Sequence, residues 1–162
     1  MKTLALTSLI ACLAFASTAA LAAMDEATKA ALATCQDTKA TPEKGVAACT
    51  AVLNSTSVKL GPKSKAQLYY NRAGFQIQAR NNAKAAEDFT AAINSYENDP
   101  DKANWPADFV GVIDSSYAFR AQINAQDNKC DAARADYRSA AATSREVSER
   151  EDYEKKAQNV CK

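Results

Sequence analysis

Apolar residues recur along this chain at steps of three and four, the spacing of one face of an α-helix. Between Tyr69 and Ile93 this spacing continues on both sides of a polar turn, ARNNAK at 79–84. The segment that begins at Tyr117 shows the same spacing around a second polar turn, AQDNKC at 125–130. Each segment therefore indicates two helices joined by a short turn.

The two segments are copies of one another. A shift of 48 residues places Tyr69 on Tyr117, Arg72 on Arg120, Ala73 on Ala121, Ala85 on Ala133, Asp88 on Asp136, Phe89 on Tyr137 and Ala92 on Ala140. A shift of 40 residues places a third, partial copy, which starts at Lys44, under the residues that start at Lys84. A lone helical hairpin cannot bury its apolar face, so the repeats predict an all-α stack of hairpins.

This arrangement resembles the tetratricopeptide repeat (TPR), a hairpin of ~34 residues with an aromatic residue, a small residue and a later A-x3-F. With Ala66 as the first position, the family's places are taken by Tyr69, Ala73, Ala85, Phe89 and Ala92. The resemblance implies a right-handed stack of two to three TPR-like helical hairpins, at about 25–55, 64–98 and 114–142, in one domain over 23–162. A polar capping helix at about 146–161 would protect the open end. An ordinary helical bundle with a duplicated hairpin is the alternative.

The sequence departs from the TPR pattern in its spacing and in its polar residues. The extra residues must lie between hairpins, within 55–64 and 97–114. PADFVGVI at 106–113 is either a separate short helix or the early part of the helix that carries Tyr117. Gln76 replaces a second tyrosine of the family.

Two arginines, Arg72 and Arg120, stand where the TPR family has leucine. We expect them near the packing between helices, with their guanidinium groups in water or paired with Asp88 and Asp136. A role facing a ligand remains open for both.

The first residues predict export. Lys2 precedes an apolar run and then small residues, as in a secretory signal peptide over 1–22, with cleavage before Ala23 or one residue later. A lipid-modified Cys12 and a retained membrane span are the alternatives. The apolar run continues past Cys12, and it is shorter than the ~20 residues that a spanning helix needs. The sequence therefore predicts a periplasmic or secreted protein of a Gram-negative bacterium.

The cysteines predict two disulfides. Four of them follow the signal peptide, namely Cys35, Cys49, Cys130 and Cys161, and an even number in an exported chain favours pairing. Cys35 and Cys49 lie at equal distances from a turn at Pro42, so an antiparallel hairpin would bring them together. The same symmetry, about a midpoint between Arg145 and Glu146, pairs Cys130 with Cys161.

Charge and composition exclude several functions. Removing Lys2 from the 20 basic residues leaves as many as the 19 acidic ones, a balance that does not point to nucleic acid or anionic lipid. The chain has no histidine, no C-x-x-C, no G-x-S-x-G and only four glycines, which argues against catalysis, metal binding and a cofactor. The neighbouring carboxylates Glu87 and Asp88 are explained as solvated charge on a repeat helix.

TPR stacks line a concave groove with the first helix of each hairpin. By this resemblance the groove positions are Tyr70, Asn71, Gly74, Ile77 and Gln78 in one hairpin, and Ala118, Phe119, Gln122, Ala125 and Gln126 in the next. TPRs that bind a terminal carboxylate place lysine and arginine there, whereas amide, aromatic and small side chains favour an uncharged segment. The resemblance implies a non-catalytic module that binds a protein or peptide of the envelope. A secreted factor and a self-associating envelope protein are the alternatives.

Overall fold

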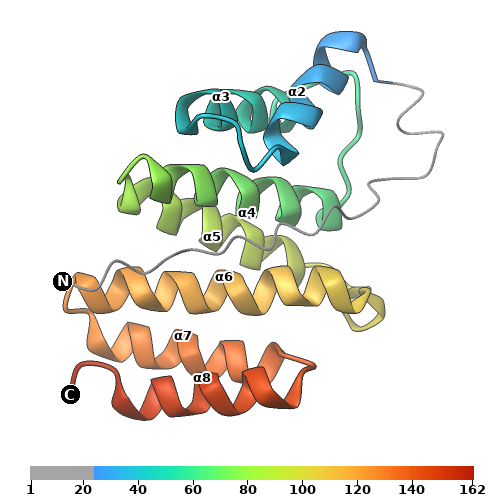
Figure 1. Cartoon of the computed structure of the whole chain (residues 1–162). Helices are drawn as coiled ribbons and strands as arrows, with labels where there is room; N and C mark the ends of the chain where they lie inside the picture. Colours follow the sequence, from blue (N-terminus) through green and yellow to red (C-terminus); the bar gives the residue numbers. More distant parts are fainter. Residues whose placement is uncertain (1–23) are drawn as a thin grey trace.

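A computed structural model describes residues 24–162 of the chain, and all regular elements in this range are helical (Figure 1). The helices are α2 (Glu26–Gln36), α3 (Pro42–Leu53), α4 (Pro62–Gln78), α5 (Asn82–Glu97), the 3-10 turn η1 (Lys102–Asn104), α6 (Ala107–Gln126), α7 (Cys130–Thr143) and α8 (Val147–Asn159). The predicted all-α class is confirmed. The predicted signal peptide and Cys12 lie outside the described residues.

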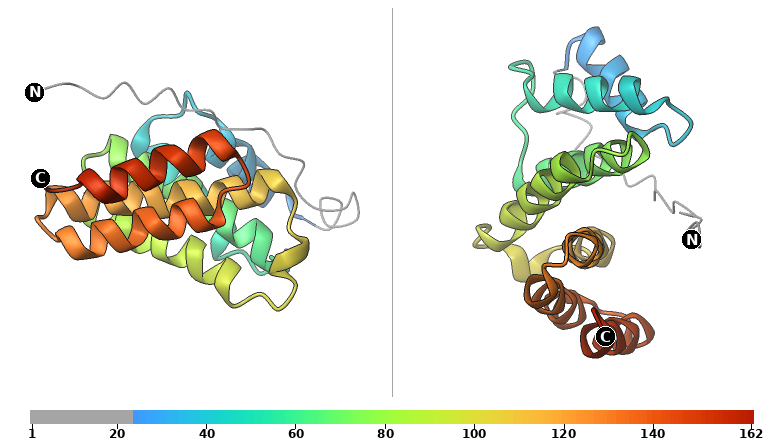
Figure 2. Two further views of the ribbon diagram at one scale, coloured as in Figure 1. Left: turned by 90° about the horizontal axis from the view of Figure 1, so that it is seen from below. Right: turned by 90° about the vertical axis from the view of Figure 1, so that its left-hand side faces the viewer.

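Three hairpins follow one another along the chain, and a single helix follows the third. The pairs are α2–α3, α4–α5 and α6–α7, and each helix also contacts the first helix of the next pair. The first helices touch directly as well, α2 against α4 and α4 against α6. Figures 1 and 2 show the resulting series of layers, which ends with α8 packed on α7.

The turns inside the second and third hairpins have the same backbone geometry. Arg80 and Asn128, which are 48 residues apart, both adopt the left-handed conformation, with φ of 59° and 60°. In each turn the next residue's N–H donates to a carbonyl five residues earlier, at 2.8 Å, which closes the helix end. The repeat seen in the sequence therefore includes the backbone of the turns.

Residues 97–114 do not form a loose insert. Helix α6 runs without a break from Ala107 to Gln126, so 106–113 is the early part of the helix that carries Tyr117. Trp105, just before it, is 1 % exposed, and its indole N–H donates to Asp99 Oδ2 at 2.8 Å. Its ring packs edge-on against Tyr96 and Phe109, which fixes the connection to the core.

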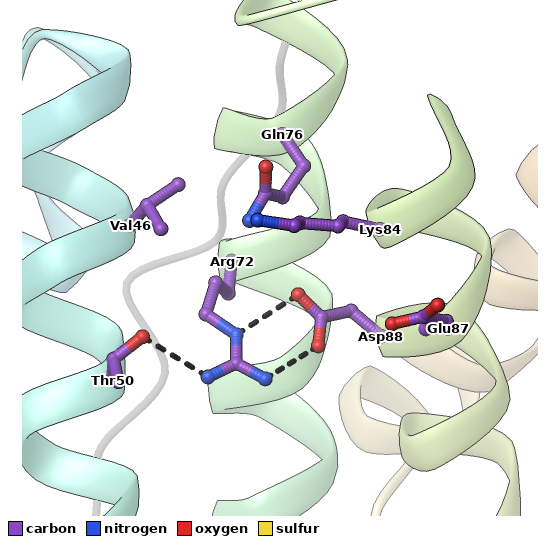
Figure 3. A pocket seen from close by; sticks show the side chains of 7 residues that line it. All are labelled: Val46, Thr50, Arg72, Gln76, Lys84, Glu87 and Asp88. Carbon is purple, nitrogen blue, oxygen red and sulfur yellow. Dashed lines mark hydrogen bonds and ion pairs between the residues drawn. The ribbon is translucent and has the colours of Figure 1, made fainter. Parts of the chain in front are cut away.

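An arginine joins the first hairpin to the second (Figure 3). Arg72 of α4 donates Nε and Nη2 to the carboxylate of Asp88 on α5, at 2.9 and 2.6 Å. Its remaining terminal nitrogen, Nη1, donates to Thr50 Oγ1 on α3 at 3.0 Å. The guanidinium also lies 5.5 Å from the ring centroid of Tyr69. The predicted pairing with Asp88 is confirmed. Asp88 is buried, which corrects its interpretation as solvated charge, whereas Glu87 is exposed, in agreement with that interpretation.

The same bridge joins the second hairpin to the third. Arg120 donates to Asp136 at 2.9 and 2.6 Å and to Thr90 Oγ1 at 3.0 Å, and it lies 5.5 Å from the ring centroid of Tyr117. A two-point arginine–carboxylate contact is stronger than a single hydrogen bond and fixes orientation. We call these two sets, Thr50–Arg72–Asp88 and Thr90–Arg120–Asp136, the arginine bridges.

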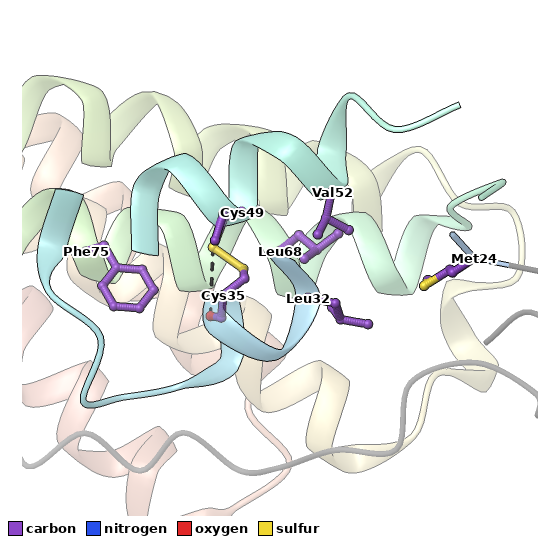
Figure 4. Close-up of a cluster of buried hydrophobic side chains, with 8 residues drawn as sticks. Met24, Leu32, Cys35, Cys49, Val52, Leu68 and Phe75 are labelled. Atoms are coloured by element: carbon purple, nitrogen blue, oxygen red, sulfur yellow. Dashed lines mark hydrogen bonds between the residues drawn. A yellow bond between two sulfur atoms is a disulfide. The ribbon is translucent and has the colours of Figure 1, made fainter. Parts of the chain in front are cut away.

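The core of the first hairpin surrounds a disulfide (Figure 4). Cys35 and Cys49 are bonded, fully buried, and packed with Leu32, Val52, Leu68 and Phe75. Cys130 and Cys161 form the second disulfide, so both predicted pairings are confirmed. One bond ties α2 to α3, and the other ties the start of α7 to the end of α8.

Helix α8 is polar over most of its surface, as predicted. Of its residues only Ala157 is buried, while Tyr153 packs against the apolar residues of α6 and α7. One i, i+4 ion pair forms in this helix, between Asp152 and Lys156, at 2.6 Å. Exposed pairs of this kind stabilise a helix by only a few tenths of a kcal/mol, so packing on α7 holds α8 in place.

Candidate functional site

The first candidate site is the face formed by the first helices of the second and third hairpins, α4 and α6. Tyr70 and Phe119 extend from these helices and are both half-buried, with ring centroids 6.3 Å apart. Each also contacts Phe89, which lies behind them and is 1 % exposed. The structure therefore brings these two predicted groove residues together.

The other predicted groove residues differ in their exposure. Gln78 and Gln126 are exposed, Gly74, Ile77, Gln122 and Ala125 are half-buried, and Ala118 is buried. Gln126 accepts a hydrogen bond from Asn82 Nδ2 at 3.0 Å. Gln78 and Gln122 lie on the same two helices as the aromatic pair, α4 and α6.

Asn71 lies inside the protein rather than on this face. It is 3 % exposed. Its Nδ2 donates to the carbonyl oxygen of Cys35 at 3.4 Å, and its Oδ1 accepts from Gln67 Nε2 at 2.9 Å. The side chain thus links α4 to the end of α2, and a partner at the surface would not reach it.

A buried carboxyl group lies behind the same face. Asp114 of α6 is 2 % exposed, and burial raises the pKa of this group to about 7, with a further contribution from the charge of Glu149 on α8. Hydroxyl groups of Ser144 and Ser115 oppose the shift, and Ser115 Oγ lies 3.3 Å from Asp114 Oδ1. Burial also raises the pKa of Tyr70. No sequence pattern singled out Asp114, although it lies three residues before Tyr117 and seven before Ala121, on the same face of the helix.

The second candidate site is a cavity of about 250 Å³ between α3, α4 and α5 (Figure 3). We call it the polar cleft. Its lining consists of one apolar residue, the first arginine bridge and three further polar residues, namely Val46, Thr50, Arg72, Asp88, Gln76, Lys84 and Glu87. Figure 3 shows Lys84 extending from α5 toward Gln76 on α4. Sequence reasoning noted Arg72 and Gln76 as departures from the TPR pattern but did not place them in a cavity.

The cleft and the groove face differ in the chemistry they offer. The cleft presents an ammonium, a guanidinium, two carboxylates and an amide, whereas the groove face presents aromatic rings and amides. Within residues 24–162, no cluster of three or more cysteine, aspartate or glutamate side chains is arranged to hold a metal ion. In the same range, no helix combines the length and the apolar character needed to cross a membrane.

Comparison with known proteins adds no further guide to the site: no family model, no curated protein and no solved structure matches this chain.

Proposed function

We propose that this protein is a non-catalytic binding module of the bacterial periplasm, built as a right-handed stack of TPR-like hairpins. It binds a protein or peptide on the face formed by α4 and α6. The single observation that carries the proposal is the contact between Tyr70 and Phe119, at 6.3 Å between ring centroids. Two half-buried aromatic rings from successive hairpins form an apolar centre on this face.

Several features support the TPR-like arrangement. The repeat positions match the family at the aromatic, small and A-x3-F places. The first helices of successive hairpins contact one another, which is the relation that lines one face of a repeat stack. The repeated turns and arginine bridges also favour a duplicated unit. Arg72 and Arg120 stand where the family has leucine, so polar contacts replace an apolar contact between helices.

The chemistry of the face favours an uncharged segment. Aromatic rings supply apolar contact area at low conformational cost. The amides of Gln78 and Gln122 donate and accept hydrogen bonds, and both functions suit a peptide backbone. No lysine or arginine stands among the groove positions taken from the resemblance, so a terminal carboxylate has no counter-charge there.

One observation and one prediction support location in an oxidising compartment. The first is the pair of disulfides, since such bonds persist in the periplasm and outside the cell. The second is the signal peptide predicted over 1–22. Both are compatible with secretion as well.

A cross-linked pull-down from the envelope fraction tests the proposed partner. The groove variant combines Gln78→Ala, Gln122→Ala and Gln126→Ala. Its control combines Asn94→Ala and Arg138→Ala, two exposed polar residues on the second helices α5 and α7. We expect wild type and control to recover one envelope protein that the groove variant loses.

Other results would replace the proposal. Equal recovery by all three baits, or recovery by none, would remove the support for this face. Accumulation of the mature protein in the culture medium would favour a secreted factor instead. Oligomers that grow with protein concentration would favour a self-associating envelope protein.

A further inference from the structure

The junction that contains the polar cleft occurs twice in the chain. Helices α3, α4 and α5 meet around the first arginine bridge, and α5, α6 and α7 meet around the second, with the same three hydrogen-bond distances. A polar side chain that occurs at both junctions is explained by the packing of the three helices. A polar side chain that occurs at only one junction is not needed for that packing.

Two charged residues of the cleft, Lys84 and Glu87, occur only at the first junction, whereas an amide stands at both. The 48-residue repeat places Asn124, Ala132 and Ala135 at the positions of Gln76, Lys84 and Glu87. Asn124 donates Nδ2 to Asp136 Oδ2 at 3.1 Å and so completes the second bridge.

The three cleft residues of the first junction differ in burial, since Gln76 is 7 % exposed whereas Lys84 and Glu87 are exposed at the surface. Within the described residues, the amide of Gln76 forms no hydrogen bond to the protein, and neither Lys84 nor Glu87 forms an ion pair, although all three line the cavity. The second junction folds with alanine at two of these positions. The charges of Lys84 and Glu87 are therefore not needed to build the junction.

The charges left in the cleft are one positive and one negative. Arg72 and Asp88 compensate each other at 2.6 and 2.9 Å, which leaves the ammonium of Lys84 and the carboxylate of Glu87. A guanidinium has five N–H groups, and Arg72 uses three of them in the bridge. Two N–H groups of Arg72 and the amide of Gln76 therefore remain for a ligand.

From this arrangement we infer that the polar cleft binds a small zwitterion, a molecule that carries a free carboxylate and a free ammonium group. Lys84 and the unused N–H groups of Arg72 bind the carboxylate, Glu87 binds the ammonium, and Gln76 hydrogen-bonds to either group. The cavity of about 250 Å³ is smaller than the usual range for drug-sized ligands. A free α-amino acid or a short peptide with both ends free fits this size and charge.

This inference is independent of the proposed groove. The cleft is lined by α3, α4 and α5, whereas the groove face belongs to α4 and α6, and no residue is shared between them. Failure of one test leaves the other unaffected.

Thermal unfolding of the purified protein with added ligand tests the inference first. The probes are the proteinogenic amino acids and the dipeptides Ala-Ala and Gly-Gly at millimolar concentration, since any ligand bound only by the folded state raises the unfolding temperature. For the best amino acid, its N-acetyl form lacks the ammonium and its amide lacks the carboxylate. We expect the parent compound to bind at least tenfold more tightly than either derivative by calorimetry. A dipeptide that binds more tightly than every amino acid would identify peptides as the source of the zwitterion.

The matched variant gives the first cleft the two alanines of the second junction, Lys84→Ala with Glu87→Ala, and keeps Gln76. The control removes one positive and one negative charge from the exposed start of α3, Glu43→Ala with Lys44→Ala. We expect the first variant to weaken binding at least tenfold while it unfolds at the wild-type temperature without ligand, and the control to bind as wild type. The inference is overturned if no amino acid or dipeptide binds, if both derivatives bind as well as the parent, or if the first variant binds as wild type.

Discussion

Replacing Asp114 by asparagine should remove much of the pH dependence of folding stability between about pH 4 and pH 7. The carboxyl group of Asp114 is 2 % exposed, and burial, reinforced by the charge of Glu149, raises its pKa from 3.8 to about 7. Asparagine has nearly the same shape and no charge. The substitution therefore changes the electrostatics while it preserves the packing.

The sign of the effect follows from the raised pKa. Between about pH 4 and pH 7 the folded protein keeps a proton on Asp114 that the unfolded chain has lost. The contribution of Asp114 to the free energy of unfolding is therefore fully present below its ordinary pKa of 3.8. This contribution falls as the pH rises from about 4 to about 7 and stays low above that pH. A pKa rise from 3.8 to about 7 corresponds to roughly 4 kcal/mol, at 1.36 kcal/mol per pKa unit.

Urea unfolding followed by circular dichroism at about pH 4, 6 and 8 measures this effect as the difference between wild type and variant. Because other titratable groups are common to both proteins, their contributions cancel in the difference. We expect similar stabilities near pH 4 and a more stable Asp114→Asn protein near pH 8. Glu149→Gln should show a smaller gain, since burial, the larger cause, remains in that variant.

Parallel pH profiles for wild type and Asp114→Asn would refute the reasoning. That result would mean that Asp114 is ionised at neutral pH without cost, and hence that water or an unrecognised donor solvates it. An Asp114→Asn protein that is less stable at every pH would show instead that the amide cannot be accommodated.

Three further predictions concern the packing of the helices. Gly45→Ala should destabilise the protein by about 1–3 kcal/mol in urea unfolding, because the added Cβ would lie 2.5 Å from ring atoms of Phe75. In the control Gly111→Ala the added Cβ meets no atom within 4 Å, so this variant should be more stable by about 0.5–1 kcal/mol. Equal effects of the two substitutions would contradict the prediction. Asp136→Ala should lower the free energy of unfolding by about 2 kcal/mol, a value between those of exposed and of buried salt bridges. A double-mutant cycle with Arg120→Leu should give a coupling energy above ~1 kcal/mol. Mild reductant should open the Cys130–Cys161 disulfide, in which Cys161 is exposed, before the fully buried Cys35–Cys49 disulfide. Mass mapping of alkylated thiols reports the order in which the two disulfides open.

The hairpins and the disulfide pairings could be predicted because both depend on distances along the chain. Helical periodicity fixes which residues share a face, and an antiparallel turn brings together positions at equal distances from it. That rule paired Cys35 with Cys49 before any tertiary contact was known. The 48-residue repeat aligned the second helix of one hairpin with that of the next, and it placed Asp88 on Asp136.

Some expectations went beyond what local pattern can support. A threonine directly before a helix favours a side-chain cap, and Thr41 directly precedes α3, but its side chain forms no capping hydrogen bond. The repeat had aligned Thr50 with Thr90 without indicating a purpose, and the structure shows that each accepts a hydrogen bond from an arginine of the next hairpin. Helix periodicity gives a direction around one axis, whereas a hydrogen bond between hairpins depends on how two axes approach each other.

The sequence by itself determined the helices, their pairing into hairpins, the duplication and the disulfides, because each follows from local spacing or from offsets along the chain. Only the tertiary structure decided that Asn71 is buried, that Asp114 is enclosed beside Glu149, and that a cavity remains between α3, α4 and α5. These features depend on three or more helices meeting around one side chain. Where several helices meet, the volume left between them sets the burial and charge of each group, and no single helix pattern contains that volume.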